Sequence, residues 1–83
     1  MLGMNPSKQF VLDVVDECYR SLKQFPLFRS PHEGCAVIRE EFEELWDAVK
    51  HNQPNVYDEL VQTAAMCLKF AESVQLWEEA TDG

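Results

Sequence analysis

The sequence is poor in basic side chains and has no long apolar run. Only seven Lys and Arg residues oppose fifteen Asp and Glu residues, and the formal net charge is -8 at pH 7. This balance argues against a nucleic-acid surface, which needs a basic stripe. No apolar segment approaches the roughly 18 residues of a membrane-spanning helix, and the N-terminus lacks a basic and then apolar signal pattern. We therefore expect neither nucleic acid nor a membrane as a partner.

The cysteines are few and widely spaced, and none belongs to a CxxC or Cys/His ligand pattern. Cys18, Cys35 and Cys67 each lie among apolar neighbours at helical spacing, where a small buried side chain fits. We interpret them as reduced core thiols, which indicates a cytoplasmic protein.

The sequence does contain three stretches with helical periodicity, separated by breaks that contain proline. The chain has 83 residues, 46% of them hydrophobic, which suits one small domain. Pro26 and the segment HNQPN interrupt the pattern, since proline cannot continue a helix. The sequence therefore predicts helices over about residues 6–24, 31–51 and 56–79.

Each predicted helix follows a residue that can cap it. Asn5 and Ser30 both precede a proline, which is well suited to the first helical turn. Glu33, three residues after Ser30, completes the pattern of a capping box. Asn55 can cap the third helix.

The third predicted helix is apolar on nearly all sides. One face carries Leu60, Ala64, Cys67, Ala71 and Val74, a second carries Val61, Ala65 and Leu68, and a third carries Met66, Phe70 and Trp77. Such a helix must be buried nearly all round, and two other helices cannot cover so much surface. We predict an all-α bundle of three main helices that homodimerisation completes, mainly through the third helix, with a tetramer as the larger alternative. The single domain spans residues 1–83, and residues 1–5 and 80–83 are expected to be flexible tails.

The second predicted helix combines an apolar stripe with a dense group of acids. The stripe, which we expect to face the core, consists of Ile38, Phe42, Leu45, Trp46 and Val49. Glu40 and Glu43 are expected on the solvated side. Glu41 and Glu44 are three residues apart, so they point two carboxylates at one spot. On the third helix, Glu59 shares a face with apolar residues and should be partly buried.

Three carboxylates that meet between two helices need a cation or protons. Two like charges about 4 Å apart repel by roughly 4 kcal/mol at a dielectric constant of about 20. With oxygen ligands and no His or Cys nearby, the cation would be Mg²⁺, or Mn²⁺ as second choice. Carboxylates on facing helices are a known way to build such a site. A solvated acidic face remains the alternative.

The spacing of these acids resembles that of a known family. EEFEE at residues 40–44, a gap of fourteen residues and then ELVQ at residues 59–62 look like the EExxE, spacer, ExxD signature of the MazG-like, all-α NTP pyrophosphatases. The resemblance covers about residues 32–75. It implies a Mg²⁺-dependent hydrolase that cleaves a nucleoside triphosphate to the monophosphate and pyrophosphate, in nucleotide-pool housekeeping.

The resemblance also implies roles for individual residues. The metal ligands would be Glu41, Glu44, Glu59 and Gln62, and the carboxylates that orient the attacking water would be Glu40 or Glu44. Arg39 and Lys69 are candidates for phosphate contacts.

One position departs from the family pattern, because Gln62 stands where the final Asp is expected. An amide oxygen can ligate a hard cation, but it brings no negative charge. Two alternatives to the enzyme therefore stay open. The domain would bind nucleotide or metal without turnover, or it would be a dimeric interaction domain with a solvated acidic face.

Overall fold

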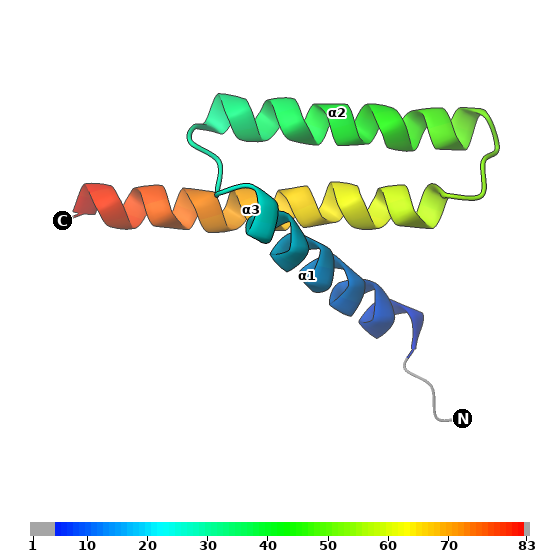
Figure 1. Ribbon diagram of the computed structural model, residues 1–83, viewed down its shortest axis with the longest axis horizontal. Helices are drawn as coiled ribbons and strands as arrows, with labels where there is room; N and C mark the ends of the chain where they lie inside the picture. The colour runs from blue at the N-terminus through cyan, green and yellow to red at the C-terminus, as the bar shows by residue number, and fades with distance from the viewer. Residues whose placement is uncertain (1–4, 83) are drawn as a thin grey trace.

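Three helices make up nearly all of the chain that the computed structural model describes, which is residues 5–82. They are α1 (Pro6–Gln24), α2 (Pro31–Lys50) and α3 (Val56–Asp82) (Figure 1). No strand occurs among the described residues, so the predicted all-helical class and the number of helices are confirmed. α3 continues beyond its expected end, because no proline or glycine interrupts the sequence before Gly83. The other parts of the expected tails, residues 1–4 and 83, lie outside the described residues.

Local hydrogen bonds fix the starts of the first two helices. Asn5 Oδ1 accepts from the backbone N–H of Lys8 at 2.9 Å, and Ser30 Oγ accepts from that of Glu33 at 3.1 Å. Glu33 differs from its expected role in the capping box, in which its carboxylate would accept from the backbone N–H of Ser30. The Glu33 carboxylate accepts from the backbone N–H of Arg29 at 3.2 Å, so it holds the loop that leads into α2.

α1 and α2 both pack against α3. Within residues 5–82, α1 and α2 do not pack against each other. α2 and α3 run antiparallel as a hairpin, while α1 leaves α3 at a wide angle (Figure 1). The radius of gyration is 14.6 Å, compared with about 12 Å for a compact domain of this length. The single chain is therefore open. No helix in the described part is long and apolar enough to cross a membrane.

The core lies where α1 and the α1–α2 loop meet α3. Its buried residues are Cys18, Phe28, Ala65 and Met66. Ser73 ties the loop to α3, because its Oγ accepts from the backbone N–H of Phe28 at 3.0 Å and donates to the carbonyl of Lys69 at 2.8 Å.

α2 faces α3 with a stripe that shares only Ile38 and Leu45 with the predicted one. The stripe contains buried Gly34 and Ala48 together with partly buried Val37, Ile38, Glu41 and Leu45. The expected core residues Phe42, Trp46 and Val49 are 55%, 50% and 48% exposed, so their prediction is wrong within one chain. The helices meet through small residues instead. A Cβ on Gly34 would lie 2.8 Å from the Phe70 ring, which shows how closely α2 approaches α3.

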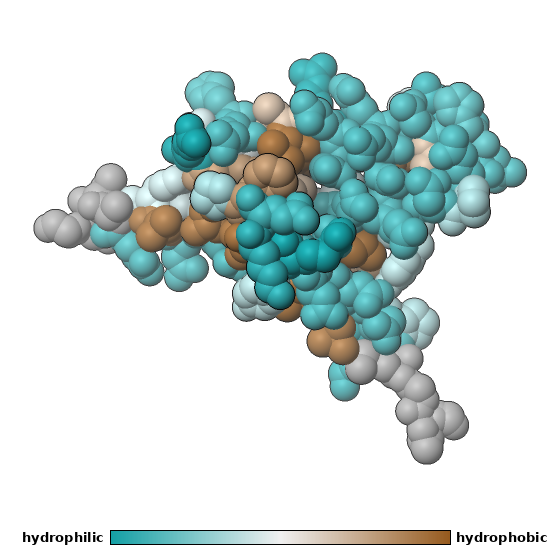
Figure 2. All heavy atoms as spheres, viewed as in Figure 1, coloured by the Kyte–Doolittle hydropathy of each residue, from teal (hydrophilic) through white to brown (hydrophobic). Residues whose placement is uncertain are grey.

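One face of α3 is left partly uncovered by the other described residues. Leu60, Cys67 and Ala71 are exposed there in the single chain, whereas the sequence predicts that a second copy buries them. Cys35, just beyond the contact stripe of α2, is exposed too, so only Cys18 is a core thiol as predicted. Figure 2 shows hydrophobic side chains reaching the surface over α3 and over α1, while hydrophilic ones cover the outer side of α2.

Candidate metal centre

Three carboxylates from α2 and α3 converge on one point. Glu41 and Glu44 lie one turn apart on α2, and Glu59 lies in the first turn of α3. Each offers one oxygen atom, and the three oxygens lie within 4.8 Å of one another. The antiparallel hairpin brings them together, because the middle of α2 packs beside the start of α3.

Two of these carboxylates are partly buried and incompletely paired. Glu41 Oε2 and Glu59 Oε2 are buried and accept no hydrogen bond from any described residue. Glu59 Oε1 accepts one from Asn55 Nδ2 at 3.3 Å, so the predicted cap of α3 holds this carboxylate in place. Glu44 is exposed. Because a buried unpaired carboxylate is costly, the site favours a proton or a cation.

Burial and mutual repulsion both favour the protonated form of these acids. Burial, followed by the nearby charges of Glu44 and Glu59, raises the pKa of Glu41 to about 7. Burial also raises the pKa of Glu59, with Glu44 as the next cause. A cation that displaced the proton of Glu41 would relieve the same repulsion.

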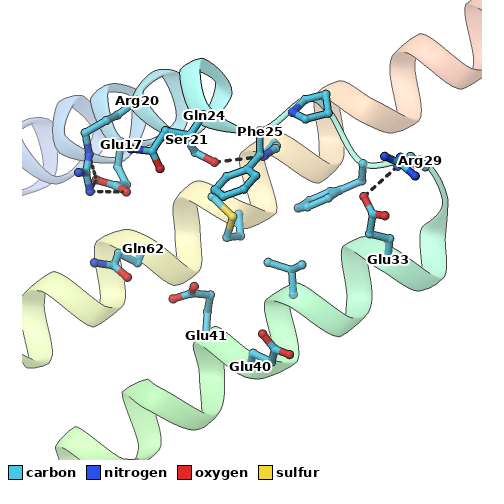
Figure 3. Close-up of a pocket in the computed structure, with 15 residues that line it drawn as sticks. Glu17, Arg20, Ser21, Gln24, Phe25, Arg29, Glu33, Glu40, Glu41 and Gln62 are labelled. Carbon is cyan, nitrogen blue, oxygen red and sulfur yellow. Dashed lines mark hydrogen bonds and ion pairs between the residues drawn. The ribbon is translucent and has the colours of Figure 1, made fainter.

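The donor set fits a hard cation. All three ligand atoms are carboxylate oxygens, which is the chemistry that Mg²⁺ and Mn²⁺ prefer. Gln62 lies one helical turn after Glu59 and is partly buried. Its side chain lines the same cavity as Glu41 (Figure 3).

This cavity has a volume of about 600 Å³, which falls in the range of small-molecule sites. Glu40 and Glu41 come from α2 and Gln62 from α3, whereas Glu17 and Arg20 come from α1 (Figure 3). Arg20 forms an ion pair with Glu17 at 2.7 Å and so neutralises one acid of the wall. Glu40 is exposed at the cavity, where water can reach it.

The other end of the cavity combines two aromatic rings with one buried ammonium group. Lys69 is only 2% exposed, and its Nζ donates to Ser21 Oγ at 3.0 Å. The Nζ atom lies 5.0 Å from the ring centroid of Phe28 and 6.0 Å from that of Phe25. Burial lowers the pKa of this lysine. Arg39, the other candidate for phosphate contacts, is exposed and pairs with Glu43 at 3.6 Å.

The sequence indicates Lys69 as a candidate for phosphate contacts but does not predict that its side chain is buried beside two aromatic rings. A signal for it exists in the run AAMCLKFAES, where Lys69 and Ser73 are polar residues four apart in an otherwise mostly apolar helix. That spacing places both on one helix face, and the structure buries both.

Fold and site together define an all-helical protein with a carboxylate cluster at the wall of a cavity. Comparisons with protein-family models, with curated proteins and with solved structures find no match to this chain. The resemblance to MazG-like proteins therefore rests on the acids and their spacing.

Proposed function

We propose that the chain is a Mg²⁺-dependent nucleoside triphosphate pyrophosphohydrolase of the MazG-like type, which releases a (deoxy)nucleoside monophosphate and pyrophosphate. The observation that supports it most is the convergence of Glu41, Glu44 and Glu59 within 4.8 Å, with Glu41 also lining a cavity of about 600 Å³. The reaction itself is the one that the sequence resemblance implies.

Each residue of the site has a task in this proposal. Glu41, Glu44 and Glu59 would hold Mg²⁺, or Mn²⁺ in its place, together with the amide oxygen of Gln62. When bound, the cation supplies positive charge that binds and polarises the phosphate oxygens, which explains how so acidic a protein could bind a polyanion. Glu40 and Glu44 are exposed, so either carboxylate can orient the attacking water and accept its proton.

The proposal includes a homodimer, or a tetramer built from two dimers. The single chain is open, and large apolar side chains such as Trp46, Leu60 and Leu76 are between 41% and 50% exposed. A second copy that covered them would remove this apolar surface from water. The free thiols of Cys35 and Cys67 are exposed, which fits a reducing compartment such as the cytoplasm.

Gln62 supports a second candidate function. With an amide in place of a carboxylate, the site carries three formal charges, and its attraction for a cation is weaker. The domain would then bind metal and nucleotide without turnover.

The experiment is a pyrophosphate-release screen over the common nucleoside triphosphates with Mg²⁺ and then Mn²⁺. Wild type is compared with Gln62→Asp and with Gln75→Asp, a control that adds the same charge at an exposed position of α3. We expect release by wild type and faster release by Gln62→Asp alone. Nucleotide binding without release in any of the three proteins would favour the binding module. Neither binding nor release would contradict both functions.

A further inference from the structure

The buried end of the cavity holds the ammonium group of Lys69, which has more N–H donors than it uses in hydrogen bonds. A lysine has three N–H donors, and the hydrogen bond from Lys69 Nζ to Ser21 Oγ uses one of them. Lys69 forms no ion pair with a described residue. The rings of Phe25 and Phe28 flank the Nζ atom. A ligand that offered an oxygen acceptor would satisfy donors that these rings satisfy only weakly.

The distance along α3 suits a nucleotide that lies between the acids and this lysine. Ten residues separate Glu59 from Lys69, which corresponds to about 15 Å of helix rise. Gln62 and Lys69 are seven residues apart, so both lie on the same face of α3, and both line the cavity. If the phosphates are held at the acids, the nucleoside extends toward Lys69, and its base reaches the rings of Phe25 and Phe28.

The surroundings of Lys69 favour a base over a phosphate. The Phe25 ring is 63% exposed and lines the cavity, and Phe28 is buried beside it, so a planar base can stack or make edge contacts there. Gln24 and Arg29 also line the cavity, and their donors would serve a phosphate or a base alike. A phosphate would in addition meet the negative charge of Glu33, which lines the same cavity.

The edges of the bases differ in the chemistry that an ammonium group can recognise. Uracil and thymine carry a carbonyl oxygen at position 4, and guanine carries one at position 6. Cytosine and adenine carry an amino donor at these positions. An N–H donor therefore favours the bases with a carbonyl oxygen and disfavours the bases with an amino group.

We propose that Lys69 is a specificity-determining residue that donates a hydrogen bond to the carbonyl oxygen at position 4 of a pyrimidine or position 6 of a purine. The substrates would then be uracil, thymine or guanine nucleotides in preference to cytosine or adenine nucleotides. This inference rests on the function proposed above. A hydrogen bond to a charged group is worth about ten- to a hundredfold in affinity.

The test is calorimetric binding, with Mg²⁺, of the non-hydrolysable α,β-imido analogues of dUTP, dCTP, dGTP and dATP. Wild type should bind the dUTP and dGTP analogues at least about tenfold more tightly than the other two. Lys69→Met keeps an unbranched side chain of similar length and should abolish this preference by weakening those two analogues only. Lys23→Met, at an exposed position of α1, should behave as wild type.

Three results would overturn the inference. Equal affinity of wild type for all four analogues does so without any variant, even if Lys69→Met fails to fold. Equal weakening of all four analogues and of inorganic tripolyphosphate by Lys69→Met would show that Lys69 contacts phosphate. In both cases, pyrophosphate release by wild type would leave the proposed function intact. Failure of every analogue to bind with Mg²⁺ would overturn the inference and the proposed function together.

Discussion

Glu41→Gln should stabilise the metal-free protein at neutral and higher pH. The pKa of Glu41 is raised from 4.5 to about 7, so between these values the folded chain binds more protons than the unfolded chain. The free energy of unfolding therefore falls as the pH rises through this window. An acid with a lowered pKa would show the opposite sign. Glutamine keeps the shape of the side chain and removes both the proton and the charge.

The size of the effect follows from the same pKa. The difference between 4.5 and about 7 corresponds to about 3.4 kcal/mol, at 1.36 kcal/mol for each pH unit. Because Glu41 is only partly buried, water screens its charge, and we expect a gain of about 1 to 2 kcal/mol. For a domain of this size each kcal/mol shifts the melting temperature by about 4 to 8 °C.

The assay is urea denaturation with a chelator present, at steps from pH 4.5 to 8. Glu43→Gln is the matched control, because Glu43 is exposed and pairs with Arg39 on the same helix. Glu41→Gln should gain on wild type steadily as the pH rises, whereas Glu43→Gln should follow wild type. A constant difference between Glu41→Gln and wild type across this range would refute the electrostatic reasoning.

Three further predictions use the same preparations. Mg²⁺ at about 100 times its dissociation constant should add about 2.7 kcal/mol to wild-type stability and nothing to Glu59→Gln; an equal gain in both would place the metal elsewhere. Gly34→Ala should destabilise the protein by about 1 kcal/mol in thermal melts, because overpacking against Phe70 outweighs the gain in helix propensity. Ala36→Gly, at an exposed position of the same helix, should lose only about 1 kcal/mol of helix propensity. A Gly34→Ala variant more stable than wild type would show that the Phe70 ring moves freely. Sedimentation at micromolar concentration should give about twice the chain mass of 9.6 kDa, and Trp46→Glu should lower it; a folded wild-type monomer would contradict the dimer.

The sequence predicts the helices well because their signals are local. Asn5 and Ser30 accept the capping hydrogen bonds that their positions indicate. The prediction that Phe42, Trp46 and Val49 lie on the buried face of α2 was wrong for a different reason. Large apolar residues such as Phe42 and Trp46 dominate its pattern, whereas the contact with α3 depends on Gly34 and on the distance at which two helices meet. That distance is a property of both helices and cannot be taken from either one.

The candidate site also has one part that the sequence predicts and one part that depends on tertiary packing. The convergence of Glu41, Glu44 and Glu59 was predictable, because a short turn joins two antiparallel helices and the spacing then places the acids side by side. The lysine end of the cavity was predictable only in part, because the spacing of Lys69 and Ser73 places both on one helix face but does not show what packs around them. It depends on Phe28, which belongs to a loop without periodicity and whose position is fixed by a long-range hydrogen bond to Ser73.

Gln62 has an electrostatic consequence for the protein without metal. It lies one turn from Glu59 and lines the cavity beside Glu41, whose proton is already held to about pH 7. A fourth carboxylate there would add repulsion of up to roughly 4 kcal/mol at a separation of about 4 Å. We therefore expect Gln62→Asp to bind Mg²⁺ more tightly and to be less stable than wild type in chelator, with the order reversed at saturating metal. Thermal melts of Gln62→Asp and Gln75→Asp under both conditions measure this, and equal behaviour of the two variants would mean that Gln62 does not sense the acids. An amide at this position would therefore attract the cation less strongly than a carboxylate but would leave the metal-free chain more stable.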